Sequence, residues 1–234
     1  MIPPTTSASS TENSVKRGAF IVLEGVDRCG KTTQSGLLVK HLIKMGLAAM
    51  AIQFPDRTTA VGSLINQYLQ SSSDLNDRAI HLLFSANRWE AVDEMKRQLD
   101  SGTTLVCDRY SHSGVAFSSA KTTNLSTEWC KRPDMGLPAP DAVIFLDLSQ
   151  DEAEKRGGYG GERYEKRDMQ MRVRQRFNDL RKADDGHIPW HVIDASKSVS
   201  DVTSDIVAIA EKVVAESCDK PIQELWVDAE NTTT

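Results

Sequence analysis

Short apolar runs rich in β-branched residues alternate along this chain with longer segments of helical period. This alternation predicts βαβ units, and therefore a parallel sheet covered by helices on both faces. We expect an α/β fold, a three-layer sandwich around a five-stranded parallel sheet. The predicted strands are residues 19–24, 47–54, 103–107, 142–148 and 190–194.

Apolar residues three or four positions apart mark the predicted helices. The first begins at Lys31 and stops at Gly46, a residue suited to a left-handed C-cap. A second helix is expected near residues 61–69, and one long third helix over residues 74–99.

A glycine-rich segment interrupts the helical pattern after the fourth predicted strand. Ser149 and Glu152 form a capping box that opens a short helix running to Arg156. Four glycines follow within residues 157–161, before another helix predicted over residues 164–182. Because glycine restricts the backbone least, we expect a mobile flap at about residues 156–164.

A length of 234 residues fits a single domain. We place it at residues 18–227, with a frayed tail at 228–234. The first seventeen residues are rich in Ser, Thr and Pro and predict a disordered extension. A mitochondrial presequence is the alternative, weakened by the single Arg and by Glu12.

Composition narrows the class of protein. Apolar residues make up 39% and charged residues 26%, as in an average soluble domain. A formal net charge of −5 argues against a nucleic-acid partner, and no apolar run is long enough to span a membrane. The four cysteines have neither zinc-ligand nor disulfide-framework spacing. We expect a cytoplasmic protein, with a nuclear or mitochondrial fraction as the alternative.

The segment GVDRCGKT, from Gly25 to Thr32, matches the P-loop pattern and lies between a predicted strand and a predicted helix. Glycines let backbone N–H groups approach phosphate oxygens closely. Lys31 would place its charge on the β- and γ-phosphates, while the Thr32 hydroxyl would bind the Mg²⁺ that accompanies the nucleotide. The motif predicts a P-loop NTPase-type fold that binds ATP or GTP.

Other P-loop classes fit less well. A GTPase would need an N/T-K-x-D motif after a strand, and the nearest match, residues 165–168, begins with Glu and lies in a predicted helix. A mechanical ATPase or a nucleotide sensor without catalysis would not explain the isolated arginines at the ends of strands and helices.

Three charged residues follow predicted strands. Asp108 and Arg109 come directly after the third strand, and Arg57 follows the second. Ligands of open α/β folds bind at this edge of the sheet, where Asp108 would support Mg²⁺. The two arginines could hold a phosphate other than the one bound by the P-loop, or form surface salt bridges.

Phe84 and Arg88 are four residues apart in the predicted third helix, so they lie on one face. The pair could stack on a flat base and hydrogen-bond its edge. A core Phe beside a solvated Arg is the alternative.

Between about Gly18 and Trp226, the chain resembles the thymidylate kinase family. The resemblance rests on LEGVDRCGKTTQ, QFPDRTT, HLLFSANRWE, DRYSHSGVAF, CKRPDMGLPAPD, KRGGYGGERYE and DASKS, in this order. It implies a homodimer that transfers the γ-phosphoryl group of ATP to dTMP. Another pyrimidine nucleoside monophosphate kinase or deoxynucleoside kinase of the same fold is the alternative, although Arg57 favours an acceptor that already carries a phosphate. A scaffold protein without catalysis is a further alternative.

The resemblance also implies roles for individual residues. Phe84 would stack on thymine, Arg88 would bind its carbonyl edge, and Arg57 and Arg109 would bind the monophosphate. The acceptor site would comprise Asp27, Phe54, Arg57, Phe84, Arg88, Arg109, Ser113, Gly114, Phe117, Glu162, Tyr164 and Gln170. The ATP site would comprise Gly25, Asp27, Arg28, Cys29, Gly30, Lys31, Thr32, Thr33, Arg156 and Lys197. Catalysis would rest on Asp27, Arg28, Lys31 and Arg109, and the metal on Thr32 and Asp108.

Arg28 lies within the P-loop, while residues 157–161 contain no basic residue. This pattern resembles the subgroup of the family that supplies its catalytic arginine from the P-loop. Arg163, just beyond the glycines, is the alternative source of that charge.

Overall fold

The computed structural model describes residues 16–123, 125–156, 161–184 and 186–227. The parallel strands lie in the order β2-β3-β1-β4-β5, which confirms the predicted five-stranded sheet. The strands are β1 (Phe20–Glu24), β2 (Ala49–Gln53), β3 (Thr104–Asp108), β4 (Ala142–Asp147) and β5 (Trp190–Asp194). The helices are α1 (Lys31–Lys44), α2 (Ala60–Leu69), α3 (Asp77–Trp89), α4 (Val92–Asp100), α5 (Ser111–Ser119), α6 (Thr127–Lys131), the 3₁₀ turn η1 (Arg132–Asp134), α7 (Gln150–Lys155), α8 (Arg167–Ala183) and α9 (Val199–Ser217).

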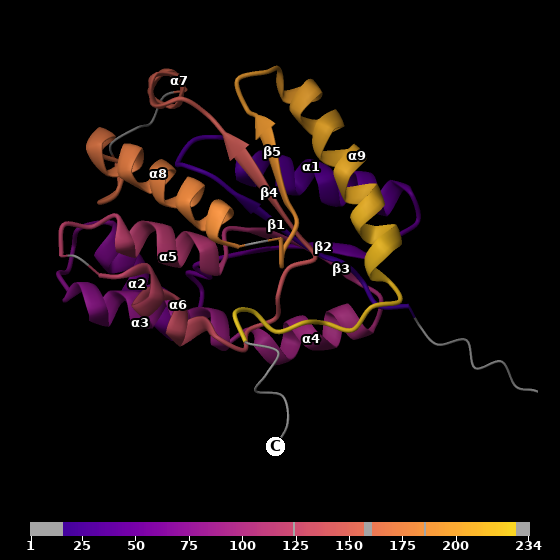
Figure 1. Cartoon of the computed structure of the whole chain (residues 1–234), viewed down its shortest axis with the longest axis horizontal. Coiled ribbons are helices and arrows are strands. Elements are labelled where there is room, and N and C mark those ends of the chain that lie inside the picture. Colours follow the sequence, from indigo (N-terminus) through magenta and orange to yellow (C-terminus); the bar gives the residue numbers. More distant parts are fainter. Residues whose placement is uncertain (1–15, 124, 157–160, 185, 228–234) are drawn as a thin grey trace, which may run out of the picture.

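Helices cover both faces of the sheet, as the alternation of elements predicts (Figure 1). Successive residues of β1 point to opposite faces. Ile21 and Leu23 join the cluster that contains buried residues of α1 and α9. Phe20 and Val22 join the cluster that contains buried residues of α4. The sheet is therefore apolar on both sides and holds the carboxyl ends of its central strands in fixed positions.

The single long helix predicted over residues 74–99 is wrong. The chain forms α3 and α4 instead, separated by a tight turn in which the Ala91 N–H donates to the Arg88 carbonyl at 3.1 Å. The break redirects the apolar face. Ile80 of α3 packs with α2, whereas Met95 and Leu99 of α4 pack against the sheet. A straight helix would not bring both sets of side chains to their partners.

The sequence-based prediction did not include two further helices, α5 and α9. In α5, almost every residue is buried, so the apolar stripe by which an amphipathic helix is recognised is absent. In α9, Ser198 accepts a hydrogen bond from the backbone of Asp201, an N-cap that the sequence could have revealed. By contrast, the predicted cap at Ser149 is confirmed, since its side chain accepts from the Glu152 N–H at the start of α7.

The predicted terminal segments and glycine flap lie partly outside the described residues, namely at residues 1–15, 157–160 and 228–234. Arg17 is described and pairs with Asp141, its Nη2 lying 2.6 Å from Oδ1. The four cysteines are free thiols. Among the described helices, none is long and apolar enough to cross a membrane.

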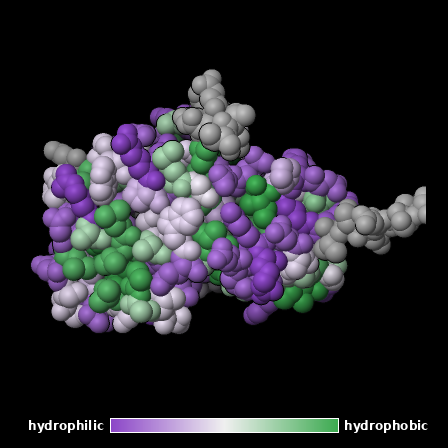
Figure 2. All heavy atoms as spheres, turned by 90° about the horizontal axis from the view of Figure 1, so that it is seen from below, coloured by the Kyte–Doolittle hydropathy of each residue, from purple (hydrophilic) through white to green (hydrophobic). Residues whose placement is uncertain are grey.

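Apolar side chains gather on the face seen from below in Figure 2, at the end of the molecule where Figure 1 places α2, α3 and α6. Leu64 on α2 and Leu82 on α3 are each 48% exposed, and Trp89 at the end of α3 is 41% exposed. These side chains form an exposed apolar surface, which we call the α2/α3 face.

Candidate active site

Two adjoining pockets lie at the carboxyl ends of β1 and β3. The larger, of about 620 Å³, surrounds the P-loop, and we call it the donor pocket. The smaller, of about 230 Å³, lies beside α3 and α5, and we call it the acceptor pocket. Four residues line both of them: Asp27, Thr32, Asp108 and Arg109.

Nearly all of the predicted site residues line these pockets. Of those predicted for ATP, only Gly25 is not in the lining of the donor pocket, and its carbonyl accepts hydrogen bonds from Lys31 and Arg109. Of those predicted for the acceptor, only Gln170 is not in the lining of the acceptor pocket. Its Nε2 donates to Asp27 Oδ2 at 2.5 Å and its Oε1 accepts from the Asp27 N–H at 2.9 Å. Gln170 therefore fixes the position of Asp27 from outside the lining of the acceptor pocket.

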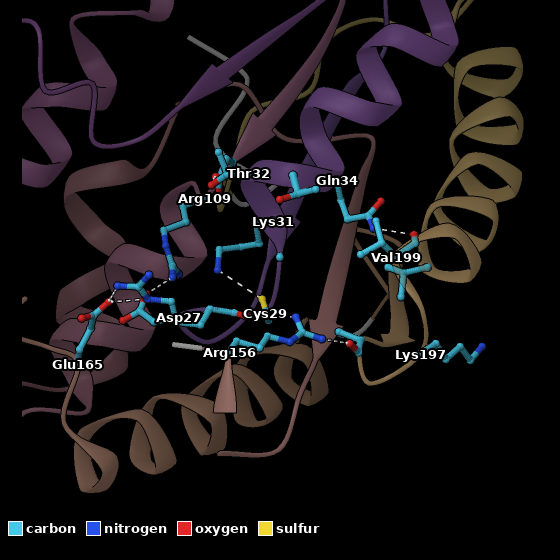
Figure 3. A pocket seen from close by; sticks show the side chains of 16 residues that line it. Asp27, Cys29, Lys31, Thr32, Gln34, Arg109, Arg156, Glu165, Lys197 and Val199 are labelled. Carbon is cyan, nitrogen blue, oxygen red and sulfur yellow. Dashed lines mark hydrogen bonds and ion pairs between the residues drawn. The ribbon is translucent and has the colours of Figure 1, made fainter. Parts of the chain in front are cut away.

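The P-loop connects β1 to α1 through residues in the left-handed backbone region. Gly25 has φ 147° and Gly30 has φ 102°. A Cβ on Gly25 would lie 2.6 Å from the Leu146 carbonyl oxygen, so only glycine fits beside β4. Lys31 is 5% exposed, and its ammonium donates to the Val26 carbonyl at 2.8 Å. Figure 3 shows Lys31 between Cys29 and Arg109, with its amine directed into the pocket.

Arg28 lines the donor pocket and follows Asp27, which lines both pockets. Its Nη2 lies 2.9 Å from Glu165 Oε1, and Glu165 also accepts from the Gly161 N–H at 2.8 Å. Arg163 points elsewhere: it pairs with Asp74 at 2.7 Å and lies over the Tyr68 ring, outside the linings of both pockets. Of the two candidate arginines, Arg28 alone lines a pocket.

The opposite end of the donor pocket is formed by Arg156 and the loop after β5 (Figure 3). Arg156 donates to the Arg28 carbonyl at 3.2 Å and to the Ala195 carbonyl at 2.5 Å. Lys197 lines the pocket and pairs with Asp205 at 2.8 Å. The sequence-based prediction did not include five further lining residues: Gln34, Glu165, Ala195, Val199 and Val202.

The predicted metal ligands meet where the two pockets join. Thr32 Oγ1 lies 2.5 Å from Asp108 Oδ2. Hydroxyl and carboxylate oxygens are the donors that Mg²⁺ prefers, and this ion usually takes only one or two protein ligands beside phosphate and water. The described residues contain no group of three or more His, Cys, Asp or Glu that could hold a metal. The donor set therefore fits a Mg²⁺ that binds together with a nucleotide.

Arg109 lies between the pockets and is held by three groups. Its guanidinium forms an ion pair with Asp27 and donates to Ser113 Oγ at 3.0 Å and to the Gly25 carbonyl at 2.9 Å. Burial alone would lower the pKa of Arg109, but Asp27, Asp108 and Glu24 raise it. The site therefore carries a fixed positive charge in contact with both pockets.

The second predicted phosphate ligand, Arg57, lies in the loop after β2. It forms an ion pair with Glu162 at 2.8 Å and lines the acceptor pocket. The buried Asn87 of α3 fixes this loop by accepting from the Asp56 N–H at 2.7 Å and donating to the Asp56 carbonyl at 3.1 Å. Asn87 supports the site, although its position within HLLFSANRWE does not disclose that role.

Phe84 and Arg88 of α3 both line the acceptor pocket, so the expected shared face is present. Arg88 is not a solvated surface arginine: it is 2% exposed and pairs with the buried Asp134 at 2.7 Å. Ser113, Gly114 and Phe117 of α5 line the same pocket. Side chains and backbone therefore provide a cavity with aromatic side chains and a buried cation in its lining.

The sequence-based prediction did not include Glu24, the last residue of β1. Its carboxylate accepts from the Tyr110 and Ser113 N–H groups at 3.0 and 2.9 Å and from Ser113 Oγ at 2.6 Å. Burial raises the pKa of Glu24, and nearby Arg109 opposes that shift. The carboxylate thus fixes the start of α5. The sequence signal that could have revealed this role is a single acidic residue in an otherwise apolar strand.

This site combines a P-loop and its lysine, an oxygen pair suited to Mg²⁺, and a second cationic pocket next to the first. Together these features fit a phosphotransferase that acts between two phosphorylated ligands. The model of the family "Thymidylate kinase" matches residues 23–206. The chain is 51% identical over 213 residues to thymidylate kinase of Danio rerio, covering 91% of this chain and 99% of that protein. It is 50% identical to thymidylate kinase of Homo sapiens, with the same coverage.

A solved structure of thymidylate kinase from Candida albicans, described as revealing the origin of broad substrate specificity, is similar to this chain. The TM-score is 0.78 at 35% identity, over 89% of this chain and 98% of that one. The chain belongs to the thymidylate kinase family, whose members are ATP-dependent phosphotransferases that convert dTMP to dTDP.

Proposed function

We propose that dTMP occupies the acceptor pocket and that MgATP occupies the donor pocket, so that the γ-phosphoryl group crosses where the pockets join. The observation that carries this proposal is that Lys31, Arg28 and Arg109 line the donor pocket, while Arg109 and Arg57 line the acceptor pocket. These four cations come from three separate segments of the chain and would surround two neighbouring phosphate positions. The product, dTDP, is an intermediate on the route to dTTP for DNA synthesis.

The chain's contribution to the reaction is charge and alignment. A phosphate acceptor is already ionised, so the transfer needs no strong general base. Arg57 and Arg109 hold the monophosphate against the repulsion of the ATP anion, and each would exchange its carboxylate partner, Glu162 or Asp27, for phosphate oxygens. Mg²⁺, bound by Thr32 and Asp108, would neutralise phosphate charge.

Arg28 supplies the charge that stabilises the moving phosphoryl group. It lines the donor pocket, whereas Arg163 donates hydrogen bonds to carbonyls of α2 and of the loop that follows. In this proposal, Asp27 contacts the acceptor sugar, since it lines both pockets and is fixed by Gln170.

A coupled assay that detects ADP tests the proposal. With ATP and a panel of nucleoside monophosphates, we expect the highest kcat/KM with dTMP, a lower value with dUMP, and very low values with dCMP and purine nucleotides. A higher kcat/KM with another monophosphate, or with unphosphorylated thymidine, would contradict it.

We also propose that the enzyme is a homodimer formed through the α2/α3 face, because Leu64, Leu82 and Trp89 are exposed apolar side chains on it. Replacing Leu82 by Glu should convert the dimer to a monomer in light scattering. A wild-type monomer, or a Leu82→Glu dimer, would contradict the assignment.

A further inference from the structure

Beneath the base-binding part of the acceptor pocket lies a buried ion pair that the sequence motifs do not explain. Arg88 Nη2 donates to Asp134 Oδ2 at 2.7 Å, and the two side chains are 2% and 0% exposed. Asp134 comes from η1, the turn after α6, and does not line the acceptor pocket. It therefore approaches Arg88 from behind.

The turn that carries Asp134 is fastened to α3 on both sides of the arginine. The Pro133 carbonyl accepts from Ser85 Oγ at 2.9 Å and from Trp89 Nε1 at 2.8 Å. One turn earlier, His81 contacts the Cys130 carbonyl at 3.0 Å. These contacts hold the carboxylate at one place relative to α3.

On another side, the guanidinium packs against the α5 backbone. A Cβ on Gly114 would lie 2.8 Å from Arg88 Nη2 and 3.2 Å from Nη1. The guanidinium thus lies between a fixed carboxylate and a backbone that tolerates no side chain, and its orientation is set by both.

We propose that Asp134 is a positioning residue for base recognition: it binds one edge of the Arg88 guanidinium and directs the remaining N–H groups toward the 4-carbonyl oxygen of the pyrimidine. A guanidinium has donors and no acceptor. An orientation fixed in this way therefore favours a base with a carbonyl and disfavours the 4-amino group of cytosine. This inference rests on the proposed function, in which Arg88 recognises the base.

The decisive variant is Asp134→Asn, which keeps the shape and removes the charge. We expect KM for dTMP to rise about tenfold or more, while kcat and KM for ATP change less than about threefold. The matched control is Asp141→Asn, which weakens another partly buried carboxylate–arginine pair, with Arg17, at the opposite edge of the sheet. It should leave both KM values unchanged.

An analogue of dTMP whose base is 5-methylpyrimidin-2-one provides a readout that general destabilisation would not move. In the wild type, loss of the 4-oxygen should lower kcat/KM strongly. In Asp134→Asn, removal of the 4-oxygen should lower kcat/KM by a several-fold smaller factor, because the Arg88 guanidinium is no longer directed at that oxygen. The proposal is overturned if the ratio of kcat/KM for dTMP to kcat/KM for the analogue is the same in Asp134→Asn as in the wild type.

Gly114→Ala is the second variant and decides the question if Asp134→Asn does not fold. This variant retains the charges of Arg88 and Asp134 but displaces the guanidinium. It should therefore also reduce the ratio of kcat/KM for dTMP to kcat/KM for the analogue. A ratio equal to that of the wild type would overturn the proposal.

A double variant separates this inference from the proposed function. If Arg88→Ala/Asp134→Asn raises KM for dTMP and Asp134→Asn does not, only this inference fails. If neither does, the proposed base recognition fails as well.

Discussion

The donor and acceptor pockets are built in different ways. The donor pocket takes half of its lining from one continuous segment, residues 27–34, and the rest from the end of β3, from Arg156 and Glu165, and from the loop after β5 and the start of α9. The acceptor pocket draws its lining from the ends of β2 and β3, from α2, α3 and α5, and from the segment after the glycines. A single segment therefore accounts for half of the lining of one pocket and for only a small part of the other.

The two pockets also hold their charges differently. In the donor pocket, the Lys31 ammonium lies against the carbonyls of Gly25 and Val26, while Arg28 and Lys197 pair with Glu165 and Asp205. In the acceptor pocket, Arg57, Arg88 and Arg109 each pair with a carboxylate, namely Glu162, Asp134 and Asp27. Phosphate binding to Arg57 and Arg109 should therefore be an exchange of anions, and the orientation of Arg88 should depend on Asp134, which lies outside the pocket lining.

The largest effect should come from Arg28→Gly, in the donor pocket. Arginine fingers in phosphoryl transfer contribute about 10³ to 10⁵ in turnover, so we expect kcat to fall at least about a hundredfold. KM for ATP should change little, because the P-loop backbone and Lys31 remain. Steady-state kinetics measures both values, with Arg163→Gly as the control. Near-normal turnover in Arg28→Gly would move the catalytic role to Arg163.

Next in size should be the loss of Arg88. Because Arg88→Ala alone would leave Asp134 buried without its partner, the clean variant is Arg88→Ala/Asp134→Asn. Hydrogen bonds to a charged group contribute about 1.5 to 3 kcal/mol, which predicts a rise of about ten- to hundredfold in KM for dTMP. KM for ATP should stay within about twofold. Equal rises for both substrates would mean that the two pockets are not separate in function.

A smaller effect should appear in acid, on the acceptor side of the fold. His112 of α5 is buried between Trp190 and Trp226, and burial, together with Lys131 and Arg88, lowers its pKa to about 3. In the unfolded chain, His112 binds a proton near its ordinary pKa of 6.5. Below that pH the unfolded state binds more protons, so the folded state loses stability on acidification, by about 2 kcal/mol at pH 5.

His112→Phe should remove this loss, which denaturant unfolding at pH 7 and pH 5 would measure. The matched control is His187→Phe, at an exposed position, which should keep the wild-type slope. If His112→Phe and the wild type lose the same free energy between these pH values, the buried imidazole is not what makes the fold sensitive to acid.

The strand positions could be predicted because parallel strands buried on both faces are continuous apolar runs, and the observed bounds of β1 to β5 differ from the predicted ones by two residues at most. The P-loop could be predicted because its chemistry is local. By contrast, the break between α3 and α4 depends on which neighbours Ile80 and Met95 meet, and no local pattern records that.

The sequence by itself determined the kind of chemistry: a phosphate-binding loop fixed by local backbone geometry, and the residue types needed to bind a second phosphate and a base. Only the tertiary structure decided which charge faces which. In the folded chain, Arg163 is hydrogen-bonded to α2, whereas Arg28 lines the donor pocket. Glu24 lies near Arg109, and Asp134 pairs with Arg88, and both arginines line the acceptor pocket. The physical reason is that ion pairing acts through space over a few ångströms, and the order of residues along the chain does not contain those distances.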